Sequence, residues 1–144
     1  MRAGQSDIRS IVVKREASAV FAIMADVEKL HRWSFGTWET EIAEDGIVTG
    51  TSLFDGSKLL VRIDADEGDL TIKYHLGTDR AALMPRILVR VVPGPHVGLA
   101  DDHCVLTFMA WRSEAMDEDR WRRLTASHEM EAVLLKSLIE TGRI

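Results

Sequence analysis

Two different periods of hydrophobic and polar positions organise most of the chain. Residues 37–112 contain short runs in which apolar and polar side chains alternate, as in β-strands with one buried face. Residues 117–141 instead repeat apolar side chains at every third or fourth position, as an amphipathic α-helix does. This helix contains no Gly or Pro, opens with acidic residues that suit the positive end of a helix, and stops at Gly142.

The long helix, Asp117–Thr141, carries two polar residues inside its apolar face. The residues expected on that face are Trp121, Leu124, His128, Glu131, Leu135 and Leu138, with Ala132 and Ile139 at its edges. A helix of about 25 residues is roughly 37 Å long, so it must cross a whole sheet to bury this face.

Six strands are expected between residues 37 and 112. The turn signals Asp45-Gly46 and Asp55-Gly56 separate antiparallel neighbours, because Asp-Gly suits the positive φ angles of tight hairpins. The expected strands are 37–44, 47–54, 58–65, 70–77, 86–92 and 103–112. In the last strand the outward residues would be unusually apolar: Val105, Thr107, Met109 and Trp111.

The N-terminal part supplies a further strand and two short helices. We expect a loose tail over residues 1–7, a β-branched strand at Ile8–Lys14, a helix capped by Ser18, and a second helix capped by Asp26. The element order β-α-α-β6-α predicts one α+β domain over residues 1–144. In this helix-grip fold a curved seven-stranded antiparallel sheet wraps around the long C-terminal helix.

The composition argues against several classes of binding partner. The apolar fraction of 46% and the charged fraction of 28% are those of an ordinary globular protein. A formal net charge of −5 with no basic stripe argues against nucleic acid. No stretch approaches the ~20 apolar residues that cross a bilayer, so we expect no integral membrane association. With a single cysteine, Cys104, and no signal peptide, the sequence favours a cytoplasmic protein.

The N-terminal residues also carry a resemblance to a known family. Ile11-Val12-Val13, then Ser18–Phe21, then Met24–Trp33 resemble the START-like helix-grip superfamily (SRPBCC), and within it the polyketide cyclase/dehydrase and lipid-transport group. The resemblance implies a cavity between the sheet and the terminal helix that holds a hydrophobic ligand. Members of the superfamily range from lipid carriers and hormone receptors to cyclases and co-chaperones, so the fold does not choose among these functions.

His128 and Glu131 are the principal candidates for chemistry. Residues three apart on a helix can touch, and both are expected on the face that meets the cavity. A protonated His beside a carboxylate could orient a polar ligand head or act as acid and base in a cyclisation. Alternatively, His128 fills core space while Glu131 reaches water at the helix edge.

The remaining candidates are cavity-wall residues. The Tyr74 hydroxyl could donate a hydrogen bond to a ligand. Trp38 and Phe108 could line the same cavity, or could serve only as core packing. Leu124 and Leu135 are expected to contact the apolar part of the ligand. Arg62 and Arg90 alternate with apolar neighbours and should face solvent. The histidines and Cys104 show no paired metal-ligand spacing, so we expect no metal, and no motif indicates a cofactor.

Three hypotheses of function follow. The first is binding or carriage of a hydrophobic or amphipathic small molecule, such as a lipid, isoprenoid or polyketide-like compound. The second is a cyclase or dehydratase in which His128 and Glu131 act as acid and base. The third is a protein-interaction module that uses the outer apolar sheet face, which could also serve as a homodimer surface.

Overall fold

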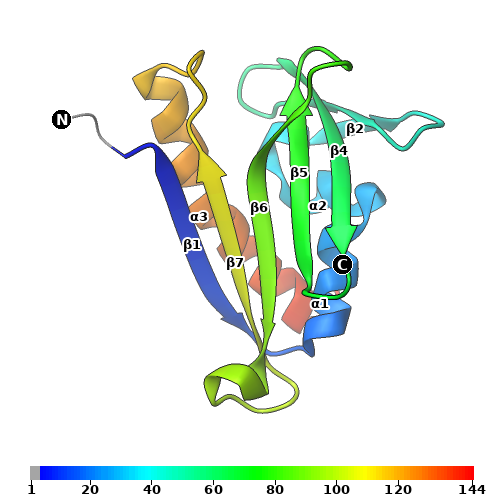
Figure 1. Ribbon diagram of the computed structural model, residues 1–144, viewed down its shortest axis with the longest axis vertical. Helices are drawn as coiled ribbons and strands as arrows, with labels where there is room; N and C mark the ends of the chain where they lie inside the picture. The colour runs from blue at the N-terminus through cyan, green and yellow to red at the C-terminus, as the bar shows by residue number, and fades with distance from the viewer. Residues whose placement is uncertain (1–3) are drawn as a thin grey trace.

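A computed structural model of the chain describes residues 4–144 as a curved antiparallel sheet of seven strands and a long C-terminal helix (Figure 1). The strands are β1 (Ser6–Val13), β2 (Glu39–Ile42), β3 (Val48–Thr51), β4 (Lys58–Asp66), β5 (Thr71–Gly77), β6 (Met84–Pro93) and β7 (Cys104–Trp111). Their spatial order is β1-β7-β6-β5-β4-β3-β2, and every neighbouring pair is antiparallel. The predicted α+β helix-grip architecture is confirmed.

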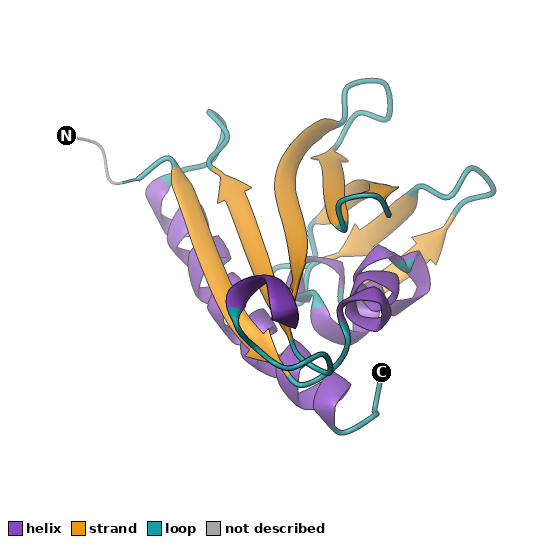
Figure 2. Ribbon diagram, turned by 60° about the horizontal axis from the view of Figure 1, so that its bottom comes forward, coloured by secondary structure: helices purple, strands orange, loops and turns teal. Residues whose placement is uncertain are grey.

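The helices gather on one side of this sheet (Figures 1 and 2). They are α1 (Ala17–Ala25), α2 (Leu30–Trp33) and α3 (Glu118–Glu140), with the 3-10 turns η1 (Val27–Lys29) and η2 (Phe35–Thr37). A third 3-10 turn, η3 (Gly94–Val97), lies in the connection between β6 and β7. The long helix α3 lies along β1, while α1 packs across β4 to β7 and α2 lies beside β2 and α3. The side chain of Asp117 caps α3 by accepting a hydrogen bond from the Arg120 N–H.

Several predicted boundaries were wrong at the N-terminal end. The strand β1 begins at Ser6 rather than Ile8, because it pairs with β7 as far as Trp111; residues 1–3 of the expected tail lie outside the described residues. Ser18 lies inside α1 and does not cap it, since the helix begins at Ala17. Asp26 does cap the next turn, as predicted, by accepting a hydrogen bond from the Glu28 N–H.

The strand predicted from residue 37 begins two residues later, because the chain first makes the turn η2 across β3. A Cβ atom placed on Gly50 of β3 would lie only 2.4 Å from the Thr37 Cγ2 atom. The absence of a side chain at Gly50 therefore lets η2 pass close over the sheet. This crossing brings Phe35–Thr37 toward α3. Because Trp38 still belongs to the end of the turn, the strand begins only at Glu39.

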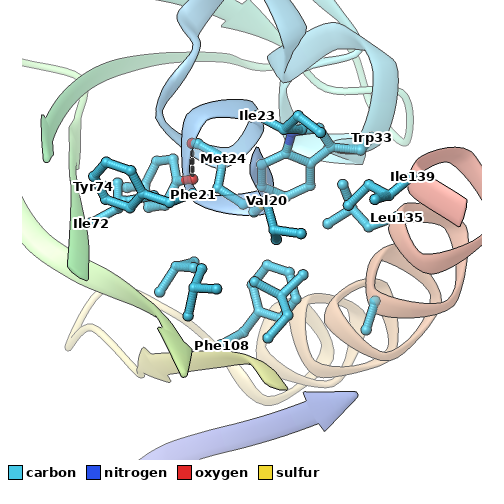
Figure 3. Packing of buried hydrophobic residues seen from close by; sticks show 14 of the residues in the cluster. Val20, Phe21, Ile23, Met24, Trp33, Ile72, Tyr74, Phe108, Leu135 and Ile139 are labelled. Carbon is cyan, nitrogen blue, oxygen red and sulfur yellow. Dashed lines mark hydrogen bonds between the residues drawn. The ribbon is translucent and has the colours of Figure 1, made fainter. Parts of the chain in front are cut away.

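The hydrophobic core lies between the sheet and all three α-helices. Figure 3 shows Val20 of α1 facing Leu135 of α3, while Phe21 and Met24 of α1 lie beside Ile72 and Tyr74 of β5. The sheet contributes its inner residues, among them Ile72, Val89, Val91, Leu106 and Phe108, each at most 1% exposed. Among the helices of residues 4–144, none has both the length and the apolar character needed to cross a bilayer.

The outer face of β7 is apolar, as the alternation predicted. Val105 and Met109 pair in register with Val12 and Ile8 of β1, which are 41% and 62% exposed. Trp111 is 42% exposed at the end of the same strand. An interaction or homodimer surface on this face stays a prediction.

Candidate functional site

A cavity of about 350 Å³ lies between the sheet, α3 and the segment from α2 to η2. Its deep end is lined by Trp33, Tyr74, Phe108 and His128. The aromatic rings contact one another: Trp33 lies 6.0 Å from Phe108 and 6.3 Å from Tyr74, measured between ring centroids. Aromatic pairs at these separations are favourable, so the deep end of the cavity has a firm apolar wall.

The mouth of the cavity lies where the β3–β4 hairpin meets the first turns of α3. Arg123 of α3 joins the two elements, with a 3.0 Å ion pair to Asp55 and its guanidinium 5.2 Å from the Phe54 ring centroid. Hydrogen bonds from Ser57 and, to a smaller extent, the Arg123 guanidinium lower the pKa of the Asp55 carboxyl, which therefore stays ionised. The hairpin is thus tied to α3 at the rim of the cavity.

His128 lines the cavity as predicted, and it is 6% exposed. Burial lowers the pKa of its imidazole to about 4, so the side chain is neutral at pH 7. Its ring centroid lies 6.2 Å from that of Phe108, and its Nδ1 atom has no hydrogen-bond partner among residues 4–144.

Glu131 also lines the cavity and is 4% exposed, so the alternative in which it reaches water at the helix edge is wrong. Its Oε1 atom accepts a hydrogen bond of 3.1 Å from the Phe35 N–H, which η2 brings against α3. Burial raises the pKa of this carboxyl to about 8, so Glu131 is mostly protonated at pH 7.

The protonation expected of this pair is therefore reversed. The sequence suggested a protonated His128 beside an ionised Glu131, whereas burial leaves the imidazole neutral and the carboxyl protonated. Within the described chain no hydrogen bond joins the two side chains, since Glu131 is held by Phe35 instead. An uncharged pair costs far less to bury than a charged one, which explains how both residues fit an apolar helix face.

Tyr74 lines the cavity wall, but its hydroxyl is already engaged. It donates a 2.5 Å hydrogen bond to the Met24 carbonyl oxygen at the end of α1, shown in Figure 3. Burial raises the pKa of the phenol well above its usual range. The expected donation to a ligand would require breaking this bond, so Tyr74 fastens α1 to the sheet.

The other candidate wall residues divide into two groups. Phe108 and Leu124 line the cavity as predicted. Leu135 does not: it is fully buried in the core beyond the cavity. Trp38 is 39% exposed and packs on Phe35 outside the cavity, because the turn η2 carries it off the sheet.

Sequence reasoning missed Arg86. Arg62 and Arg90 are exposed on the outer face, as alternation predicted, but the register shifts between Tyr74 and His75 where β5 pairs with β6. Tyr74 pairs with Ile87 and His75 with Pro85, so Arg86 is an extra residue, and it lines the cavity beside Ile87. A β-bulge turns a side chain to the other face of the sheet, which strict alternation does not predict. Pro85, which has no N–H for the ladder, was the signal in the sequence that this strand is irregular.

This chain is similar to known proteins in structure but not in sequence. No protein-family model matches the sequence, and no curated protein sequence matches it significantly. Solved structures do match. The ZhuI aromatase/cyclase from Streptomyces sp. R1128 is 17% identical, with a TM-score of 0.65 over 96% of this chain and 92% of that one.

Two further solved structures have the same architecture. The Aha1 dimer from Colwellia psychrerythraea is 14% identical, with a TM-score of 0.66 over 96% of this chain and 98% of that one. A START superfamily protein from Mycobacterium smegmatis is 13% identical, with a TM-score of 0.57 over 96% of this chain and 97% of that one. These likenesses show that the chain has a START-like helix-grip fold, as the resemblance in the sequence implied.

Proposed function

We propose that this protein binds and carries a hydrophobic or amphipathic small molecule in the cavity between the sheet and α3. The observation that supports the proposal best is the cavity itself, which combines aromatic and aliphatic walls with charged and hydroxyl side chains. Small-molecule sites typically have this composition and occupy ~300–1,000 Å³. The START superfamily and aromatase/cyclase structures that share the fold are consistent with it.

The size of the cavity limits the ligand. At about 350 Å³ it is near the lower end of the usual range, which suits one acyl chain, a short isoprenoid or a small polyketide-like ring system. The apolar part of such a ligand would lie against Trp33, Phe108 and Leu124. The three side chains belong to α2, β7 and α3, so the site exists only in the folded chain.

Filling the cavity should weaken ligand binding without unfolding the protein. Leu124 is half-buried on the cavity wall, so Leu124→Trp should occupy ligand space and weaken binding of decanol and 2-naphthol by roughly tenfold or more. Isothermal titration calorimetry of each probe would measure the loss. The matched control is Val133→Trp. Val133 is 52% exposed on the outer side of α3, so the same new side chain there should leave ligand affinity unchanged. Equal affinities for the two variants would contradict a ligand site between the sheet and α3.

A cyclase or dehydratase activity is the second candidate, and one observation favours it. Glu131 is a buried carboxyl that stays protonated near neutral pH and could donate a proton to a ligand in the cavity. The neutral imidazole of His128, with a pKa of about 4, is a weak base, so Glu131 would carry the catalytic proton transfer. Turnover of a linear polyketide analogue should then fall at least a hundredfold in Glu131→Gln, measured by product chromatography. His128→Ala turning over like wild type would agree with this assignment; full activity in Glu131→Gln would remove it.

A further inference from the structure

One cation on the cavity wall, Arg86, has no partner among the described residues. The Arg86 side chain is half-buried, and its Nε atom is buried with no hydrogen-bond partner among residues 4–144. Its guanidinium makes no ion pair with a carboxylate in that same range. Removing a charged group from water without pairing is unfavourable, so this arrangement favours an anion from outside the chain.

Positive charge is in excess around Arg86. The cavity lining contains four cationic side chains, Lys58, Arg86, Arg120 and Arg123, and two carboxyl groups, Asp55 and Glu131. Asp55 is engaged with Arg123, and Glu131 is mostly protonated at pH 7. Arg120 is exposed and makes no ion pair with a described carboxylate. Burial, and after it the like charge of Arg120, lowers the pKa of Arg86.

This local excess contrasts with the chain as a whole, whose formal net charge is −5. An anionic ligand would be repelled by most of the surface and attracted at the mouth of the cavity. A wall with low-dielectric surroundings strengthens such an attraction. The guanidinium group is the side chain best suited to two parallel hydrogen bonds with an oxyanion.

We propose that the cavity ligand is an anionic amphipath whose carboxylate or phosphate head binds Arg86, with Arg120 as the second cation at the mouth. This inference rests on the proposed binding function and names its ligand class. The apolar body of the ligand then extends inward along Trp33, Phe108 and Leu124. The orientation follows from the positions of the groups, because the cations Arg120 and Arg123 lie near the start of α3 while the aromatic wall lies deeper.

Matched acid and alcohol probes test the head group. Decanoate and decyl phosphate should bind the wild-type protein at least tenfold more tightly than decanol, as 2-naphthoate should relative to 2-naphthol, by isothermal titration calorimetry at pH 7.5. Arg86→Met keeps an apolar stem but removes the main cation and should reduce this preference to threefold or less. Decanol affinity should change less than twofold. The phosphate and carboxylate arms identify the head group, because the tighter of the two is the better match to the site.

Control variants separate ligand binding from general charge and from folding. Arg90→Met removes a cation from the exposed face of the same strand and should leave every affinity unchanged. Arg120 is exposed at the start of α3, so Arg120→Gln leaves the core intact. The substitution should lower the affinity for decanoate severalfold at low salt and less at high salt. In the ligand-free protein, Arg86→Met should raise the melting temperature, because it removes a buried charge without a partner. A purely structural role for Arg86 would lower it.

The outcomes for the two proposals differ. Failure of all the probes, charged and neutral, would contradict the binding function itself. Equal affinity for decanoate and decanol, or an equal loss of both in Arg86→Met, would overturn only the assignment of an oxyanion head. Tight binding of the acids that persists in Arg86→Met but is lost in Arg90→Met would place the anion on the outer face and would also overturn it.

Discussion

Phe108→Ala should lower the free energy of unfolding by about 3–5 kcal/mol, the range for truncating a buried aromatic residue. Phe108 is 1% exposed on the inner face of β7, and its ring meets Trp33 of α2 and His128 of α3. Three elements distant in sequence therefore lose packing together. Urea denaturation at constant pH, followed by fluorescence and circular dichroism, would measure the change.

The matched control is Trp111→Ala on the same strand. Trp111 is a larger aromatic residue, but it lies on the outer face and is 42% exposed, so its truncation should cost less than half as much. If the two variants were equally destabilised, the assignment of inner and outer faces of β7 would be contradicted. Because Phe108 also lines the cavity, its truncation should let the cavity accept a bulkier apolar probe than the wild-type protein does.

The stability of the protein should fall as pH rises above 6.5, and Glu131 is the expected cause. In the folded protein its pKa is raised to about 8 from a usual value of 4.5, so it keeps a proton that the unfolded chain has already released. A raised carboxyl pKa makes unfolding release a proton, and stability is lost as pH rises through the interval between the two values. Between pH 6.5 and 8 the loss should be about 2 kcal/mol.

The measurement starts at pH 6.5 because His128 also affects stability below that pH. Burial lowers the pKa of its imidazole from 6.5 to about 4, so unfolding takes up a proton between those values, and stability rises with pH there. Below pH 6.5 this trend opposes that of Glu131. Above pH 6.5 the folded imidazole is neutral and the unfolded one loses its remaining proton, so its opposing effect is small and Glu131 dominates the change in stability.

The variant Glu131→Gln isolates this effect. The amide oxygen can still accept the hydrogen bond from the Phe35 N–H, but the side chain cannot ionise, so stability should be constant between pH 6.5 and 8. Glu129→Gln, on the exposed face of the same helix, should keep the slope of the wild-type protein. Urea titrations at half-unit intervals of pH would measure both. A wild-type stability that did not change over this interval would show that Glu131 is ionised when folded.

The sequence alone was sufficient to predict the fold because the relevant signals are local. The apolar period of α3, the Asp-Gly turns and the alternation in β4, β5 and β7 each depend on neighbours a few residues apart. Those patterns also placed His128, Glu131, Phe108 and Leu124 on the cavity side. Faces of helices and strands follow from period, and period is visible in a single chain.

The tertiary structure decided how those residues are used. The Phe35 N–H that holds Glu131, and the Met24 carbonyl that holds the Tyr74 hydroxyl, come from segments 96 and 50 positions away. Arg86 reaches the cavity only because the pairing of β5 and β6 slips by one residue. Protonation, hydrogen-bond partners and the exact aim of a side chain depend on surroundings assembled by folding, and no local pattern in the sequence specifies those surroundings.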